Sequence, residues 1–187
     1  MMEMDTFAQQ VRARRKSLGL SLDKLSSKVG CSTAYLSLVE NGKANPSCSR
    51  IVKIAAGLEM SPGALFPSVT NQDQNNVVIR REKRLSFGFS GSDTNIELLI
   101  SPNVKKQMDA RIAVISPGGS SNGDYRHPGE EFGFVLKGTF QLVIDGMVYN
   151  LAEGDSFFFH SIRTHSFKNN SNEKAVVLWV NYPPFLF

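Results

Sequence analysis

Three side chains in the second half of the chain could share one chemical task. His127 and Glu131 stand four residues apart, and His165 follows them. Two imidazoles and one carboxylate are a suitable ligand set for Zn, Fe, Mn or Ni, and three protein ligands leave coordination positions open for another molecule. Tyr125 is nearby, but a phenol is a weak ligand at neutral pH because its pKa is about 10.

Two other interpretations fit the same residues. They could hydrogen-bond an organic ligand without any metal, or they could have a purely structural role. An arginine inside the same site would favour a ligand carrying a carboxylate or a phosphate, because the guanidinium pairs bidentately with these groups. The candidate effector-binding residues are Arg111, Tyr125, His127, Glu131, Arg163, His165 and Trp179.

The first third of the chain has the periodicity of short helices. Apolar residues recur at helical spacing up to about Phe66, and the breaks between them carry capping residues. Ser21 and Ser32 each follow a glycine and suit helix N-caps, and Asn41-Gly42 suits a helix end. We expect a bundle of four or five helices over residues 1–66.

The rest of the chain changes character after a polar stretch. Residues 67–76 read PSVTNQDQNN and contain almost no apolar residue, which is typical of a linker, and we place the linker at 67–79. Short β-rich runs then follow to residue 187, and Asp145-Gly146 is a hairpin signal. The expected strands are 96–100, 110–115, 131–136, 140–144, 147–151, 156–160, 165–169 and 175–181.

Residues 7–66 resemble the phage-repressor-like (XRE-type) helix-turn-helix family. The segment 21–42, SLDKLSSKVGCSTAYLSLVENG, has a short helix, a glycine-containing turn and a second helix, and Lys43 and Asn45-Pro46-Ser47 follow it. The resemblance implies that the second helix lies in the major groove of DNA. It assigns DNA contacts to Ser32, Thr33, Ala34, Tyr35, Ser37, Leu38, Asn41, Lys43 and Arg50.

Residues 119–169 resemble the two cupin motifs. Gly119, Tyr125, His127, Glu131 and Gly138 follow the first motif, with Tyr125 in place of its first histidine. Gly154, His165 and Asn169 follow the second motif, with His160 and Ile162 at its proline and glycine positions. The resemblance implies a double-stranded β-helix (jelly roll) over residues 80–187 and brings His127, Glu131 and His165 together inside it.

Charge is divided unevenly between the two regions. Residues 1–66 hold nine Lys/Arg and five Asp/Glu, so they carry the whole net charge of +4. A basic head joined to a neutral β-domain fits a nucleic-acid reader attached to a module with another task. No apolar run approaches the roughly 20 residues of a membrane span, and no signal peptide begins the chain. We therefore expect a cytoplasmic protein with no membrane contact.

Together the two resemblances are typical of bacterial transcription regulators with a cupin sensor. They imply a homodimer that binds a double-stranded DNA operator and responds to a small-molecule effector, with one divalent metal as the candidate cofactor and no catalytic activity. The alternative is a metal-dependent cupin enzyme of the dioxygenase or isomerase type with an accessory DNA-binding head. The residues do not identify the operator, the effector, the metal, the regulated pathway or the direction of regulation.

Overall fold

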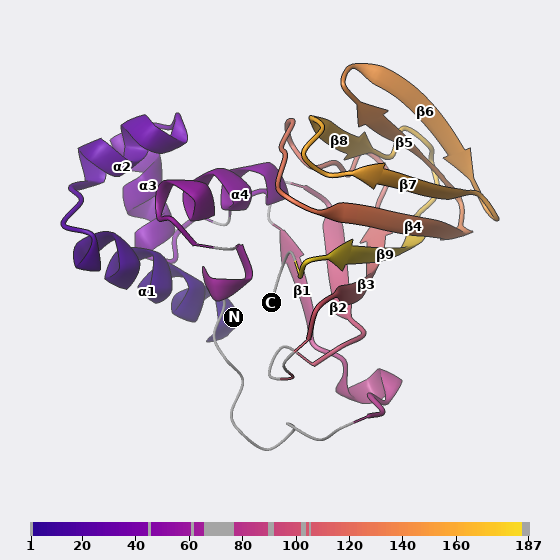
Figure 1. Cartoon of the computed structure of the whole chain (residues 1–187), viewed down its shortest axis with the longest axis horizontal. Coiled ribbons are helices and arrows are strands. Elements are labelled where there is room, and N and C mark those ends of the chain that lie inside the picture. Colours follow the sequence, from indigo (N-terminus) through magenta and orange to yellow (C-terminus); the bar gives the residue numbers. More distant parts are fainter. Residues whose placement is uncertain are drawn as a thin grey trace.

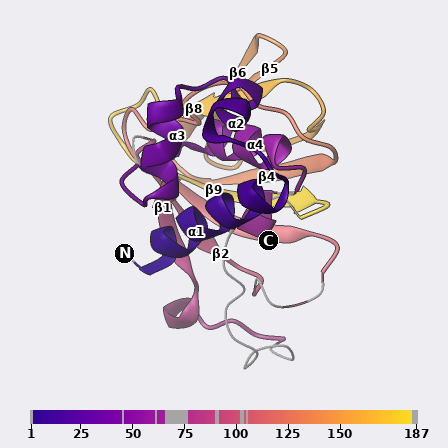
Figure 2. The same ribbon diagram turned by 90° about the vertical axis from the view of Figure 1, so that its left-hand side faces the viewer.

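The computed structural model divides the chain into a helical head and a β-barrel, which lie next to one another (Figure 1). The structure describes residues 2–44, 46–60, 62–65, 77–89, 92–101, 104 and 106–184. The view turned by 90° shows the helices on one side of the barrel (Figure 2). Most of the expected linker, residues 67–76, lies outside the described residues.

The helices begin and end where the capping residues predict. Ser21 accepts a hydrogen bond from the Lys24 amide, and Ser32 accepts one from the Tyr35 amide, so each caps the helix that it precedes. Gly30 ends its helix in the left-handed conformation at φ 69°. The head consists of α1 (Met2–Ser17), α2 (Leu22–Val29), α3 (Thr33–Glu40), α4 (Cys48–Gly57) and the 3₁₀ turn η1 (Pro62–Leu65).

A buried ion pair ties the first helix to the third inside the head. Arg15 Nε and Nη2 donate to the two carboxylate oxygens of Glu40 at 2.6 and 2.9 Å, and Arg15 Nη1 donates to the Leu20 carbonyl. Apolar side chains from every helix of the head are buried in its core. The fully buried ones include Phe7, Val11, Leu25, Leu36, Ile54, Leu58 and Leu65. Arg15 is therefore part of the core, although it counts toward the basic charge of the head.

Two antiparallel sheets form the barrel. The larger has the order β1-β2-β3-β9-β4-β7, and the smaller has the order β6-β5-β8. The strands are β1 (Ser86–Phe89), β2 (Thr94–Leu98), β3 (Asp109–Ile115), β4 (Glu130–Lys137), β5 (Thr139–Ile144), β6 (Met147–Ala152), β7 (Ser156–His160), β8 (His165–Lys168) and β9 (Ala175–Tyr182), and the 3₁₀ turn η3 (Arg81–Lys83) precedes them. This arrangement agrees with the expected jelly roll.

Strict alternation along β3 and β9 decides which side chains face the interior. Both strands alternate buried and half-buried residues, and their register places Arg111 opposite Trp179 and Asp109 opposite Asn181. On the other side of β9, Glu131 of β4 lies opposite Asn181. A row of polar side chains therefore crosses three strands on the inner face of the larger sheet.

The eight expected strands each lie within two residues of an observed strand, with the largest shift at β2, which covers 94–98 and not 96–100. β1, Ser-Phe-Gly-Phe, was not expected, because it is only four residues long and contains a glycine; its pairing with β2 defines it. The expected hairpin at Asp145-Gly146 joins β5 to β6, with both residues at positive φ. Within the described residues, no helix has the length and apolar content needed to cross a membrane.

Candidate functional site

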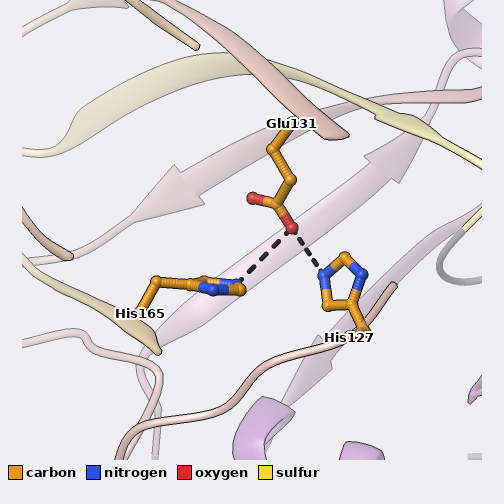
Figure 3. Close-up of side chains that lie close together, drawn as sticks. All are labelled: His127, Glu131 and His165. Carbon is orange, nitrogen blue, oxygen red and sulfur yellow. Dashed lines mark hydrogen bonds and ion pairs between the residues drawn. The ribbon is translucent and has the colours of Figure 1, made fainter. Parts of the chain in front are cut away.

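His127, Glu131 and His165 meet inside the barrel (Figure 3). His127 Nε2 lies 2.7 Å from Glu131 Oε1, and His165 Nε2 lies 3.6 Å from the same oxygen. One ligand atom from each residue lies within 4.8 Å of the other two, and all three side chains are buried. The structure thus brings together the three residues that the sequence proposed as a metal set, which we call the triad.

Backbone carbonyls fix the orientation of both imidazoles. His165 Nδ1 lies 2.8 Å from the Arg163 carbonyl, and His127 Nδ1 lies 3.2 Å from the Pro128 carbonyl. A carbonyl only accepts, so each Nδ1 carries the hydrogen and each Nε2 of a neutral ring presents a lone pair. Two lone pairs and a carboxylate then converge, and this arrangement requires a proton or a cation between them. Consistent with this, His165 Nε2 is buried without a hydrogen-bond partner among the described residues.

Glu131 is held in place from the neighbouring strand. Trp179 Nε1 donates to Glu131 Oε2 at 2.7 Å, and Asn181 Nδ2 donates to Oε1 at 2.8 Å. Complete burial works against the charged form, but with a proton between the carboxylate and the imidazoles the interactions with His127 and His165 outweigh it, so the pKa of Glu131 is lowered well below its ordinary value. The side chain is therefore a carboxylate at neutral pH, as a metal ligand must be.

Tyr125 packs on the triad. Its ring makes an edge contact with His165, with centroids 4.2 Å apart, and it stacks on His127 at 6.3 Å. Its backbone pairs with His165 in both directions: Tyr125 N donates to His165 O, and His165 N donates to Tyr125 O. Tyr125, which replaces the first histidine of the cupin motif, thus contacts both His127 and His165.

The second helix of the helix-turn-helix segment presents one face to solvent. Leu36 and Val39 of α3 are buried against the head, whereas Ser32, Thr33 and Ala34 at its start are exposed. Leu38, on the outer side of the helix, remains 45% exposed despite being apolar. This face is free to meet another macromolecule.

Family comparisons agree with both halves of this geometry. A helix-turn-helix family model matches residues 11–65, and a cupin domain model matches residues 111–181. The chain therefore carries an XRE-type helix-turn-helix domain and a C-terminal cupin domain.

Comparisons with whole proteins extend the likeness along most of the chain. The HTH-type transcriptional regulator PuuR of Escherichia coli is 27% identical over 157 residues, which are 84% of each chain. An HTH_3 family transcriptional regulator from Vibrio cholerae has a similar solved structure, with a TM-score of 0.69, 24% identity and 97% of each chain covered. An RmlC-like cupin from Shewanella frigidimarina is similar in fold at a TM-score of 0.50 and 18% identity, covering 60% of this chain and 95% of that one.

The cupin barrel contains two further polar residues that the sequence analysis missed. Asp109 accepts a 3.0 Å hydrogen bond from Arg111 Nη1, and Asn181 binds Glu131 as described above. Arg111 also lies over the Trp179 ring, 5.8 Å from its centroid. Each missed residue stands two positions from a candidate on the same strand, so period-2 alternation could have identified both.

Arg163 is not brought to this group. Its Nε donates to Asp145 Oδ2 at 2.6 Å, and both side chains are exposed at the β5–β6 turn. Because it lies outside the barrel, we leave Arg163 out of the effector site and keep its carbonyl as the partner of His165. His160 lies at the end of β7, exposed, with its Nδ1 3.5 Å from Glu130 Oε1.

The expected DNA-contacting residues occupy the outer side of the head, but several already have local partners. Ser32 caps α3, Thr33 Oγ1 lies 3.2 Å from Ser26 Oγ, and Asn41 Nδ2 donates to the Ser37 carbonyl. Arg50 Nη1 donates to the Gly30 carbonyl, and its guanidinium lies 5.6 Å from the Tyr35 ring centroid. Lys43 is exposed just after α3.

Proposed function

We propose that this protein is a cytoplasmic DNA-binding transcriptional regulator whose cupin barrel binds a divalent metal, a small-molecule effector or both, and so adjusts operator binding. The observation that carries the proposal is the triad. Two imidazole lone pairs and a carboxylate converge in the interior of a barrel that is fused to a helix-turn-helix head. Such a group requires a proton or a cation between its donors, which makes it suited to bind a divalent metal, and its burial excludes direct contact with DNA.

The exposed face of α3 is the proposed surface for contacts to DNA bases. The N-terminal residues of a recognition helix contact base edges in helix-turn-helix complexes. The small side chains of Thr33, Ala34 and Ser37 allow close approach to the bases, and exposed Leu38 suits contact with thymine methyl groups. The proposed reading residues are Ser32, Thr33, Ala34, Tyr35, Ser37 and Leu38.

Phosphate contacts position the head on the duplex. Lys43 is exposed beyond the C-terminal end of α3, where it can reach the DNA backbone, and Asn41 flanks it. Arg50 remains half exposed at the start of α4 while it stacks on Tyr35. We assign Asn41, Lys43 and Arg50 to this sequence-independent part of binding.

The triad fits a divalent metal by the chemistry of its donors. His127, Glu131 and His165 would hold the ion, and Zn, Fe, Mn and Ni all accept two imidazoles and a carboxylate. A metal bound there would supply a Lewis-acidic centre with coordination positions left for an effector. Trp179 and Asn181 keep the carboxylate in position from β9.

An organic effector would meet a mixed polar and aromatic wall. Arg111 and Trp179 lie opposite each other on β3 and β9, next to the triad row. Among the described residues, Asn181 Oδ1 is buried without a hydrogen-bond partner, so it offers an acceptor to a ligand donor. The proposed effector residues are Arg111, Tyr125, His127, Glu131, His165 and Trp179.

Two copies of the chain are needed to read a two-fold operator, because the half-sites of such an operator repeat about one helical turn apart. The outer face of β4 and β7 offers the contact for a second copy. Phe132 of β4 pairs with Phe158 of β7, and these side chains are 41% and 60% exposed. Phe134 and Leu136 continue the same face along β4, and contiguous exposed apolar side chains of this kind mark interaction sites.

The DNA half of the proposal is tested by selection and substitution. A duplex selected from a random library with the wild-type protein serves as the probe. Thr33→Ala and Ser37→Ala should each weaken binding by about tenfold or more, corresponding to roughly 1–3 kcal/mol for a base contact. Ser86→Ala, on the distant strand β1, is the matched control. DNA binding would be refuted if no duplex is selected and if the affinity of the protein for random duplex DNA does not change with salt concentration.

The barrel half is tested by elemental analysis of the tag-free protein. Near-stoichiometric metal in the wild type and none in the His127→Ala/His165→Ala double variant is the expected result, with His160→Ala as a control that keeps its metal. Equal metal in the wild type and the double variant would contradict the assigned ligands. No metal in any of them would leave the organic effector as the ligand.

A further inference from the structure

The head and the barrel are hydrogen-bonded to each other at the first turn of α4. Ser49 Oγ donates to the Asn122 carbonyl at 2.8 Å, and the Ser49 amide donates to the Ser121 carbonyl at 3.4 Å. Both Ser49 and Ser121 are buried. Figure 1 shows α4 as the helix that runs up to the barrel. We call this junction of Ser49 with residues 121–123 the Ser49 contact.

The sequence of the loop is suited to close approach. Gly123 has φ +117°, a conformation that side chains disfavour, and a Cβ placed there would lie 3.3 Å from Ser49 Oγ. On the helix side, Ser47 stands at the N-cap of α4 without a side-chain capping bond. The amide of Ser49 instead finds its acceptor in the barrel, so the barrel completes the start of this helix.

The loop is anchored to the strand that begins at the triad. The Ser121 amide donates to the Phe167 carbonyl at 3.0 Å, and the Phe167 amide donates to Ser121 Oγ at 3.2 Å. Two residues earlier in β8 and four residues further along the loop, Tyr125 and His165 exchange both backbone hydrogen bonds. Ser120 and Tyr125 each form an isolated bridge to β8, so the segment between them joins the Ser49 contact to His165.

On the head side, Arg50, the residue after Ser49, connects α4 to α3, the proposed DNA-reading helix. Arg50 Nη1 donates to the Gly30 carbonyl at the end of α2 at 2.9 Å. The same guanidinium lies over the ring of Tyr35 in α3, 5.6 Å from the centroid. A shift of the first turn of α4 would thus move both helices of the helix-turn-helix.

We propose that the Ser49 contact is the relay through which occupancy of the triad sets the position of the DNA-reading head. The route runs from His165 through Tyr125 and the 121–123 loop to Ser49, and from Arg50 to Tyr35. This inference rests on the proposed function, because it presumes that the barrel site is occupied by a ligand. A ligand shifts the head only if it binds the two arrangements with different affinities, so removing the contact should remove the response and spare both binding events.

Hydrogen exchange on the full-length protein tests the relay without a known effector. The protein is stripped with EDTA and then measured with and without Zn²⁺ as the probe. In the wild type, Zn²⁺ should change exchange in the barrel segment 125–131 and also in the first turn of α4. In Ser49→Ala, which retains a good helix former, the barrel change should persist and the α4 change should vanish. Ser17→Ala is the matched control, because Ser17 bonds only within α1 in the structure described, and it should behave as the wild type.

The outcomes separate failure of the relay from failure of the proposed function. If α4 responds to Zn²⁺ equally in the wild type and in Ser49→Ala, the relay is wrong although the metal site stands. If segment 125–131 does not respond to Zn²⁺ at all, metal binding is wrong, and His165→Gln takes the place of Zn²⁺ as the perturbation. The relay then requires that His165→Gln alter α4 exchange and that Ser49→Ala/His165→Gln lose this effect; no effect of His165→Gln on α4 would overturn it.

Binding to the selected duplex gives a second readout. In the wild type, the dissociation constants with and without Zn²⁺ should differ by about fivefold or more, the lower end of ordinary allosteric coupling. In Ser49→Ala the two values should agree within roughly twofold, while the affinity for Zn²⁺ itself stays at the wild-type level. The relay is contradicted if the dissociation constants of Ser49→Ala with and without Zn²⁺ differ as much as those of the wild type.

Discussion

Trp179 donates its indole N–H to Glu131 Oε2 across the β4–β9 pair, at 2.7 Å. This bond leaves Oε1 facing the two histidines, where it lies 2.7 Å from His127 Nε2. Trp179 itself is fully buried, and the rings of Phe157 and Phe167 lie 5.0 and 5.7 Å from it. The packing of one aromatic residue thus determines which carboxylate oxygen faces the two histidines.

Replacing Trp179 by Phe should weaken metal binding by about 10- to 100-fold, the usual effect of losing a hydrogen-bond partner of a ligand. The substitution keeps an aromatic ring in the core but removes the donor to Glu131. Competition with a chromophoric chelator at neutral pH measures the affinity. Phe140→Leu changes a neighbouring buried ring without touching Glu131 and should leave the affinity unchanged. Unaltered affinity in Trp179→Phe would show that this bond does not orient the ligand.

Zn²⁺ should raise the thermal stability of the barrel, because an ion that binds only the folded state shifts the unfolding equilibrium. At a free concentration of 100 times the dissociation constant, the gain in unfolding free energy is about 2.7 kcal/mol. Differential scanning calorimetry after EDTA treatment measures it. The gain should disappear in His127→Ala/His165→Ala and persist in His160→Ala. Its persistence in the double variant would place the ion elsewhere.

Glu40→Gln should destabilise the head by about 3 kcal/mol, because it leaves the buried Arg15 guanidinium without its counter-charge. Circular dichroism at a helix-sensitive wavelength follows the unfolding of the head. Glu59→Gln is the matched control: its partner Lys28 lies 3.3 Å away, both side chains are exposed, and the expected loss is below about 1 kcal/mol. A loss for Glu40→Gln as small as for the control would mean that the Arg15–Glu40 pair does not hold α1 to α3.

Lys43→Ala should reduce affinity for the selected duplex without changing its sequence preference. A phosphate contact contributes roughly one unit per protomer to the slope of log K against log salt concentration, because one counterion is released for each charge neutralised. Fluorescence anisotropy over a range of salt concentrations measures the slope. Lys137→Ala, exposed on the barrel, should leave it unchanged. A slope unaltered by Lys43→Ala would remove this residue from the phosphate contacts.

Phe158→Glu should convert a dimer into a monomer and weaken operator binding with it. A charge placed opposite Phe132 would be buried in the proposed contact between copies, where it would have no partner. Sedimentation equilibrium measures the assembly state, and self-association should weaken by about 100-fold or more, or roughly 2.7 kcal/mol. Met147→Glu, 60% exposed on β6, is the control. A Phe158→Glu protein that remains dimeric shows that the copies pair through another face.

Periodicity and turn chemistry account for what could be predicted about the fold. Ser21 and Ser32 cap helices as expected, because a side-chain oxygen must satisfy an amide that the helix leaves open. Asp145-Gly146 forms its hairpin because both positions require positive φ. β1 was not predicted, since four residues with a glycine carry too little pattern, and its partner β2 defines it.

The sequence predicted that three residues of the candidate site would lie together, but it did not predict their surroundings. Motif spacing identified His127, Glu131 and His165, and the structure brings them together. Arg163 stands two positions before His165, so strand alternation would place it on the inner side. It lies instead in the β7–β8 turn, which directs its side chain outward to Asp145. Asp109 and Asn181 were missed because their importance comes from strand register, which places them beside Glu131 and Arg111.

The sequence by itself determined the two-part organisation, because local propensity and binary pattern act over neighbouring residues: helical spacing up to about residue 66 and short β-rich runs from residue 96 onward. It also determined the donor types of the triad. Only the tertiary structure decided which atoms of those donors converge, which carboxylate oxygen Trp179 leaves open, and that Ser49 of the head meets the 121–123 loop of the barrel. The last two of these relationships rest on hydrogen bonds between residues 48 and 73 positions apart, and only the packing of whole elements brings such residues within hydrogen-bond distance.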